Sequence, residues 1–131
     1  MIEEKRIYVV VAGTVQVPAP RRSVVQPSGR QYAQGCHATS KLRIEKQIWY
    51  KSASDGRPLF YPITTIIKQA RDSAELTHVQ FLLRKKKLEP VSFFDTNTEA
   101  YGPNDIETAF AVLATKEQIE NILDYLPLWD S

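Results

Sequence analysis

The sequence predicts a single α/β domain whose sheet is covered by helices on both faces. Segments rich in β-branched residues alternate along the chain with amphipathic segments of helical period. The first of them, Arg6–Gly13 (RIYVVVAG), is a continuous apolar stretch of the kind found in strands that are buried on both faces. The chain has 131 residues and contains no repeat or low-complexity tract. One domain over residues 1–131 is therefore expected.

The predicted elements follow the order β-α-β-α-β-β-α. After the first strand, the proline-rich segment Thr14–Pro27 is expected to be a long loop, and a helix is expected from Gly29 to about Ser52. The later elements are a strand at Ile63–Gln69, a helix from Asp72 to about Lys87, a strand at Val91–Phe94, a polar loop at Asp95–Pro103, a strand at Glu107–Ala114 and a helix ended by Pro127. Four strands and three helices result.

Three capping-box patterns support the predicted helix starts. In each of them an N-cap residue is followed three positions later by Glu or Gln. The pairs are Ser28 and Gln31, Asp72 and Glu75, and Thr115 and Gln118. Apolar residues then recur at helical spacing, and we expect them to face the sheet. They are Leu42, Ile44, Ile48 and Trp49 in the first helix, Leu76, Val79, Leu82 and Leu83 in the second, and Ile119, Ile122, Leu123 and Leu126 in the last.

The composition is that of an ordinary globular protein. Hydrophobic residues make up 43% of the chain and charged residues 24%. Cys36 is the only cysteine, so no disulfide framework is expected and a reducing, cytoplasmic location is the default. No apolar run approaches the ~18 residues of a transmembrane helix, and the N-terminus does not resemble a secretory signal. Metal-ligand spacings and nucleotide-binding glycine loops are also missing from the sequence.

Charge is unevenly distributed along the chain. Residues 1–53 carry nine Lys and Arg against three Glu, a net charge of +6. Residues 54–131 carry eight Lys and Arg against twelve acidic residues, a net charge of −4. This asymmetry favours an electropositive face for a polyanion. Ordinary solvated surface lysines would explain it equally well.

A polar stripe marks the first predicted helix. Arg30, Gln34, His37 and Lys41 follow one another at i, i+4, i+7 and i+11, which places them along one side of the helix. The helix N-terminus adds free N–H groups and a partial positive charge, which suit an anion such as phosphate. The combination indicates a polar site.

The same segment resembles a family signature. The pairs Gly29-Arg30, Ala33-Gln34 and His37-Ala38 are similar to the first-helix motif of the type 2 peptidyl-tRNA hydrolases. The order of the elements also resembles that family, whose fold is a small mixed sheet sandwiched between helices. The likeness covers most of residues 6–127. It implies hydrolysis of the ester bond of peptidyl-tRNA, a tRNA partner, a homodimer and no cofactor.

The resemblance assigns roles to four residues. Asp95 would orient or partly deprotonate the attacking water, Thr108 would help to position that water, and Gln34 would support them. Arg30 stands where the family has a catalytic lysine. It would clamp a phosphate or an oxyanion, but it cannot accept a proton at neutral pH. Thr108 takes the family threonine position only if the preceding loop has gained one residue; otherwise that position is Glu107, whose side chain would point to the other face of the strand.

Each assignment has a structural alternative. Asp95 could simply cap a loop, and His37 could bond to backbone between helix and sheet. Cys36 is expected to be a small buried residue. The basic run at residues 84–87 is explained by its place at a helix C-terminus. Residues assigned to RNA or substrate binding are Arg21, Arg22, His37, Lys41 and Arg43.

Two other functions stay open at this point. The same fold could be a catalytically silent module that binds tRNA or a protein, because Arg30 replaces the lysine. The chain could also hydrolyse another small acyl or amide substrate, with the proline-rich segment Thr14–Pro27 as a lid.

Overall fold

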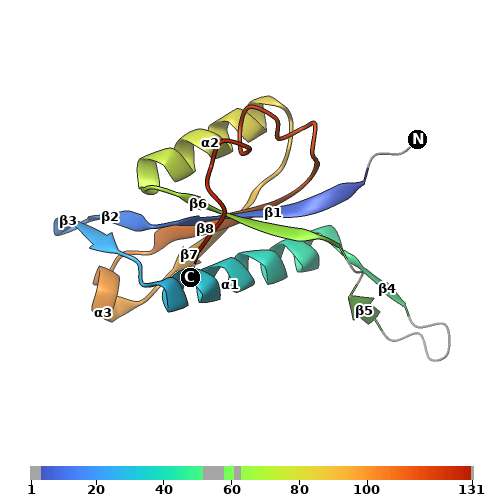
Figure 1. Ribbon diagram of the computed structural model, residues 1–131. Helices are drawn as coiled ribbons and strands as arrows, with labels where there is room; N and C mark the ends of the chain where they lie inside the picture. The colour runs from blue at the N-terminus through green and yellow to red at the C-terminus, as the bar shows by residue number, and fades with distance from the viewer. Residues whose placement is uncertain (1–3, 52–57, 61–62, 131) are drawn as a thin grey trace.

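The fold is built on one mixed four-stranded sheet, as the sequence predicts (Figure 1). A computed structural model describes residues 4–51, 58–60 and 63–130. The strand order is β6-β1-β8-β7, and the strands are β6 (Thr65–Ala70), β1 (Lys5–Ala12), β8 (Ile106–Thr115) and β7 (Val91–Asp95). Strand β1 is parallel to β6, whereas β8 is antiparallel to both β1 and β7.

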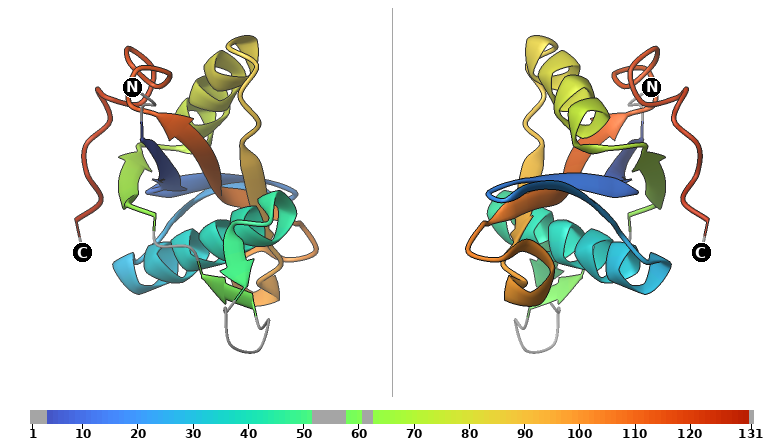
Figure 2. Two further views of the ribbon diagram at one scale, coloured as in Figure 1. Left: turned by 90° about the vertical axis from the view of Figure 1, so that its right-hand side faces the viewer. Right: turned by 90° about the vertical axis from the view of Figure 1, so that its left-hand side faces the viewer.

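Helices cover both faces of this sheet (Figures 1 and 2). The two long helices are α1 (Ser28–Lys46) and α2 (Ser73–Lys85). Alternate residues of β1 face opposite sides, because successive side chains of a strand do so. On one side Ile7, Val9 and Val11 pack in one apolar cluster with Ala38 and Leu42 of α1. On the other side Tyr8, Val10 and Ala12 pack in a second cluster with Leu76, Val79 and Leu83 of α2. Strand β1 is thus buried on both faces, as its sequence predicts.

The segment Thr14–Pro27 is not the loop that its prolines suggested. Residues 14–25 form a hairpin of β2 (Thr14–Pro18) and β3 (Arg21–Val25). Val15 and Val17 are fully buried while Gln16 between them is exposed, which is the period of a half-buried strand. The hairpin is tied down, since Arg22 donates to the carbonyl of Ala100 and Asn104 donates to the carbonyl of Ala19. A freely moving lid is therefore a poor description of this segment.

The segment that the sequence predicts as a C-terminal helix does not form a helix. Residues 116–125 form successive turns, and Asn121 has a left-handed φ of 65°, which interrupts a helical path. The predicted reciprocal bonds between Thr115 and Gln118 do form. The four apolar residues expected to face the sheet are buried in the cluster on the α2 side: Ile119, Ile122, Leu123 and Leu126. The spacing of the apolar residues therefore predicts which side chains are buried, but it does not determine that the backbone is helical.

Helix α1 begins and ends differently from the prediction. Its N-cap is Pro27, with no side-chain cap, so the Ser28–Gln31 capping box does not form. The helix ends at Lys46, because Gln47 adopts a left-handed φ of 53°. Ile44 is exposed, and the expected end at Ser52 lies outside the described residues. The chain continues instead into β4 (Trp49–Lys51), which pairs with β5 (Pro58–Phe60).

The remaining elements agree more closely with the sequence. Asp72 caps α2 by accepting a hydrogen bond from the backbone N–H of Glu75 at 2.9 Å. The polar loop after β7 contains the short helix α3 (Thr98–Tyr101), capped by Asn97. The chain end runs beside the edge strand β6, since Trp129 N donates to the carbonyl of Ile67 and Gln69 N donates to that of Pro127.

Gly35 allows α1 to lie close to the sheet. A Cβ at this position would lie 3.3 Å from Val11 Cγ1, whereas a Cβ at Gly29 would meet nothing within 4 Å. We predict that Gly35→Leu lowers the free energy of unfolding by about 1–3 kcal/mol or more through overpacking. Gly29→Leu is the matched control and should have a much smaller effect. Urea unfolding measures both, and equal losses would contradict the close packing of α1 on β1.

Candidate functional site

The centre of the candidate site is the buried side-chain amide of Gln34. Its Nε2 lies 3.1 Å from Asp95 Oδ2, 3.2 Å from Gln26 Oε1 and 3.4 Å from the hydroxyl of Tyr101. These partners come from the end of β7, from the residue that follows β3 by one position, and from α3. One amide thus brings four separate segments of the chain together.

Asp95 is fixed through both of its carboxylate oxygens. Oδ2 accepts from Gln34, and Oδ1 accepts from the backbone N–H of Asn97 at 3.2 Å. The second contact is the loop-capping role that the sequence left open. The first contact is the link to helix α1 that a site would require. Asp95 is only half buried, so the carboxylate remains within reach of solvent.

Arg30 lies one helical turn before Gln34, on the same side of α1. Burial raises the pKa of the Tyr101 phenol above its usual value of 10, and the negative charge of Asp95 adds to this rise. Hydrogen bonds with Gln26 and Gln34 lower that pKa, as does the positive charge of Arg30. Arg30 and Asp95 therefore both act electrostatically on one hydroxyl. Within the described residues, the Arg30 guanidinium has no hydrogen-bond or ion-pair partner.

Three buried polar atoms, two of them in the Gln34 network and one on β8, have unused hydrogen-bonding capacity within the described part of the chain. They are Gln26 Nε2, Gln34 Oε1 and Thr108 Oγ1. The residues are at most 2% exposed. A buried polar group without a partner costs about 1–3 kcal/mol, so such groups are usually paired with water or with a bound molecule. The Gln26 and Gln34 atoms, whose side chains contact each other, supply a donor and an acceptor suited to a polar substrate or a water molecule.

A β-bulge separates the two candidates for the threonine position. The pairing of β7 with β8 shifts between Phe93 and Phe94, and Thr108 has no partner on β7. Glu107 receives a hydrogen bond from Gln80 of α2. Its carboxylate therefore lies on the α2 side of the sheet, away from the Gln34–Asp95 contact on the α1 side.

The stripe on α1 continues past Gln34 as the sequence suggested. His37 is exposed, and its ring stacks on Phe93 with 5.0 Å between the ring centroids. Lys41 Nζ donates to the backbone carbonyl of Ser92 at 2.9 Å. Both residues thus contact β7, the strand that ends at Asp95.

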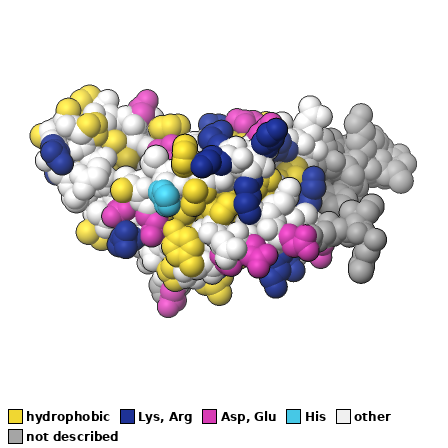
Figure 3. All heavy atoms as spheres, turned by 90° about the horizontal axis from the view of Figure 1, so that it is seen from above, with side chains coloured by type: hydrophobic (Ala, Val, Ile, Leu, Met, Phe, Trp, Pro, Cys, Tyr) yellow, Lys and Arg dark blue, Asp and Glu magenta, His cyan; other side chains and the backbone are white. Residues whose placement is uncertain are grey.

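The other assigned basic residues are dispersed. Arg22 is bound to α3, and Arg43 donates to the carbonyl of Ile48 at 3.4 Å. Arg21 lines a separate hollow beside α2. On the face seen from the α2 side, Lys and Arg side chains are interspersed with Asp and Glu (Figure 3). The charge asymmetry of the sequence does not produce a patch of one sign on that face.

One expectation for this helix is wrong. Cys36 is exposed, not buried. Residues 34, 35, 38 and 42 of α1 are buried, and position 36 lies about 200° around the helix from position 34. The side chain is therefore directed away from the sheet.

Sequence reasoning did not identify Gln26 and Tyr101. The Tyr101 hydroxyl donates to Gln26 Oε1 at 2.9 Å, and both side chains are buried. One sequence feature could have indicated a role for Tyr101: it is an aromatic residue in a polar loop, directly before the Gly102-Pro103 break. No sequence feature indicates the role of Gln26, because that role depends on where β3 ends.

Comparisons with known proteins give a likeness of fold alone. The chain is similar in structure to a protein of unknown function, Atu0240, from Agrobacterium tumefaciens. The TM-score is 0.59 at 9% sequence identity, over 99% of this chain and 100% of the other. No protein-family model and no curated protein matches the sequence.

None of the helices in the described ranges is both long and apolar enough to cross a membrane. No group of three or more His, Cys, Asp or Glu side chains among these residues is placed to hold a metal ion.

The buried hydroxyl of Tyr101 should contribute to stability. We predict that Tyr101→Phe lowers the free energy of unfolding by about 1–2 kcal/mol, because its partner Gln26 loses a donor inside the protein. Tyr32→Phe is the matched control, since the Tyr32 ring is 57% exposed. Urea unfolding of the two variants at neutral pH tests the prediction. Equal stability of both variants would show that the hydroxyl is not part of the network.

Alkaline pH should weaken the fold through the same group. The folded-state pKa of Tyr101 is raised above 10, so this residue favours the folded protein below its unfolded-state pKa. That contribution is lost as pH rises from about 10 through the raised folded-state pKa. We expect the stability of Tyr101→Phe to fall less steeply over this range than that of the wild type. Unfolding curves at a series of pH values from 9 upward would show parallel slopes if Tyr101 titrated normally.

Proposed function

We propose that this protein hydrolyses the ester bond of peptidyl-tRNA, or of a closely related acyl-RNA, and so frees the RNA. The observation that carries the proposal is the 3.1 Å contact between Gln34 and Asp95, with Arg30 one helical turn away. Asp95, which is 61 residues from Gln34 in the sequence, thus contacts the helix that carries Arg30. The resemblance of the Gly29–Ala38 segment to the type 2 peptidyl-tRNA hydrolases supplies the substrate class. A hydrolase-like placement of the helices on the sheet is part of the proposal.

The chemistry needs a water molecule, a proton acceptor and a cation. Asp95 accepts a proton from water as the water oxygen attacks the ester carbonyl carbon. Arg30 stabilises the oxyanion that forms on the carbonyl oxygen. The carbon–oxygen bond to the ribose then breaks, and the proton passes to the ribose oxygen. Gln34 holds the carboxylate in position, and Thr108 Oγ1 offers the water a further hydrogen bond.

Arg30 is suited to only one of the roles that a lysine can play. A guanidinium stays protonated at neutral pH, so it can stabilise negative charge but cannot act as a base. Its planar donors bind a phosphate or carboxylate oxygen pair in two places at once, where lysine acts as a point charge. In our proposal the cation clamps charge, and Asp95 alone handles the proton.

The partner, assembly and location follow the same proposal. Arg30, His37 and Lys41 would contact tRNA along the exposed side of α1. Arg21, Arg22 and Arg43 would contact it at the edge of that surface. Homodimer formation and a cytoplasmic location belong to the proposal as expectations of the family resemblance.

A catalytically silent tRNA- or protein-binding module is the second candidate. Two observations favour it. Arg30 cannot shed a proton, and both oxygens of Asp95 already accept hydrogen bonds. Each of these oxygens therefore has fewer free lone pairs with which to contact an attacking water.

One assay of ester hydrolysis, with an N-acetylated aminoacyl-tRNA as the substrate, distinguishes the two candidate functions. We predict that wild type releases tRNA from an N-acetylated aminoacyl-tRNA, and that Asp95→Asn reduces the rate by about 10²–10⁴-fold. Arg30→Lys should retain much of the rate and Arg30→Met should lose it, if the group acts as a cation. Glu99→Gln, on the exposed surface of α3, is the matched control for removing a carboxylate. Tight binding without turnover in wild type, with activity gained in Arg30→Lys, would establish the silent module.

Salt dependence tests the nature of the partner. If cations of α1 contact phosphates, the affinity for tRNA should fall steeply between about 50 and 200 mM salt. Lys41→Gln should reduce the slope of log affinity against log salt by about one unit. Filter-binding or fluorescence titration measures both quantities. An affinity that does not change with salt would exclude a phosphate-dominated interface.

A further inference from the structure

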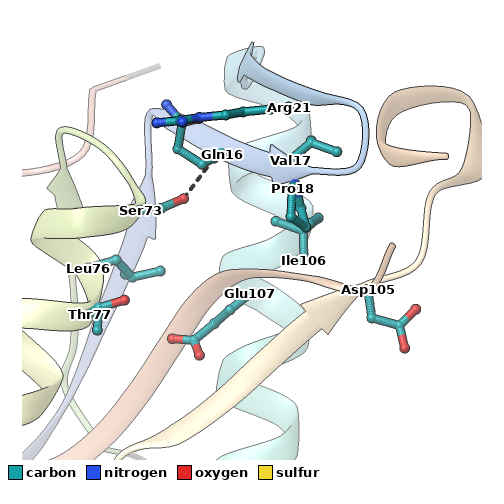
Figure 4. Close-up of a pocket in the computed structure, with 10 residues that line it drawn as sticks. All are labelled: Gln16, Val17, Pro18, Arg21, Ser73, Leu76, Thr77, Asp105, Ile106 and Glu107. Atoms are coloured by element: carbon teal, nitrogen blue, oxygen red, sulfur yellow. Dashed lines mark hydrogen bonds between the residues drawn. The ribbon is translucent and has the colours of Figure 1, made fainter. Parts of the chain in front are cut away.

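A hollow outside the candidate site lies on the α2 side of the sheet. It has a volume of about 550 Å³ and lies between the hairpin β2–β3, the first turns of α2 and the start of β8 (Figure 4). Its apolar wall is made of Val17, Leu76 and Ile106. The hydroxyl-bearing residues Ser73 and Thr77 of α2 also line it. The volume is that of a small-molecule site.

The chemically distinctive group in this hollow is the carboxylate of Glu107. The side chain extends from β8 toward Thr77 of α2, whereas that of Asp105 is directed away from the hollow (Figure 4). Gln80 donates a hydrogen bond to Glu107, and the hydroxyl of Ser92 donates to Gln80 Oε1 at 3.2 Å. The carboxylate is thus held in a fixed position by α2 and β7.

The environment of Glu107 does not satisfy its charge. Burial raises the pKa of this carboxyl group, outweighing the hydrogen-bonding groups of Gln80 and Ser92 and the positive charge of Arg84, which lower it. No cation within the described residues forms an ion pair with Glu107. A half-buried carboxylate of this kind gains more from a cationic partner than one that is fully solvated.

The other lining residues narrow the class of ligand. The Ser73 Oγ accepts from the backbone N–H of Gln16 at 2.9 Å. The hydroxyl-bearing Thr77 lies further along α2, toward Glu107 (Figure 4). The apolar wall suits a hydrocarbon body. Arg21 stands at the hairpin side of the hollow and would repel a second positive charge.

We propose that this hollow is a binding site for a small organic monocation, a protonated amine on an apolar body, with Glu107 as its counter-ion. The ammonium group donates to the Glu107 carboxylate and to the hydroxyl of Thr77. The apolar body lies against Leu76 and Ile106. The site is on the opposite side of the sheet from the Gln34–Asp95 contact, so the proposal does not depend on the proposed hydrolase activity.

Probes of matched shape and different charge test the site. We expect 2-phenylethylamine to give saturable changes in the amide NMR signals of residues 73–80 and 105–107. The neutral isostere 2-phenylethanol and the anion 3-phenylpropionate should bind at least about tenfold more weakly, the loss expected when one charge-assisted contact is removed. Spermidine should bind no more tightly than the monoamine, because Arg21 opposes further positive charge. Equal binding of the alcohol and the amine would overturn the proposal.

Three variants locate the binding. Glu107→Gln keeps the size of the side chain and its contact with Gln80, and should weaken amine binding by about tenfold or more. Thr77→Trp fills the hollow from an exposed helix position and should abolish binding without disturbing the core. Asp105→Asn is the control for charge alone and should leave the affinity within about twofold, since this side chain points away. Unchanged affinity in Glu107→Gln or in Thr77→Trp, or no saturable binding by wild type, would refute the site.

Discussion

The arrangement of the candidate site depends on one buried amide. Gln34 projects from α1 toward the sheet and contacts Asp95, Gln26 and Tyr101. An amide nitrogen has only two hydrogens, so the three acceptors share them and each constrains the others. Because the group is buried, losing any partner would expose the remaining polar atoms to an apolar environment. The amide therefore fixes the relative positions of α1, the end of β7, the hairpin and α3.

The two faces of the sheet carry different polar groups because β8 is irregular at one point. The bulge at Thr108 breaks the strict alternation of side chains that a regular strand would impose. Glu107 is directed to α2, while the carboxylate of Asp95 on the neighbouring strand is directed to α1. One sheet can thus hold a polar network on the α1 side and a separate hollow on the α2 side. Bulges often serve to redirect side chains in this way.

The local hydrophobic pattern of the sequence predicts the strands of the sheet well and the segments that connect them poorly. The apolar stretch at Arg6–Gly13 and the spacing of residues after Asp72 were read correctly, because strand and helix burial leave a direct periodic signal. The hairpin at residues 14–25 is not predicted, because the prolines and the two arginines of the Thr14–Pro27 segment outweigh a short alternation of valines. The final segment kept its predicted burial but not its helix, since Asn121 takes a left-handed conformation that hydrophobic spacing does not encode. The stripe on α1 was foreseen, whereas Gln26 and Tyr101 entered the site only through tertiary contacts.

The most direct test of this account is a double-mutant cycle on Gln34 and Asp95. Gln34→Leu, Asp95→Ala and the double variant would be compared with the wild type by urea unfolding. The account predicts that the effects of the single substitutions are not additive, with a coupling of about 0.5–3 kcal/mol, because the two groups interact directly. Additive effects, within about 0.3 kcal/mol, would mean that the helix and the strand end are not joined through this contact.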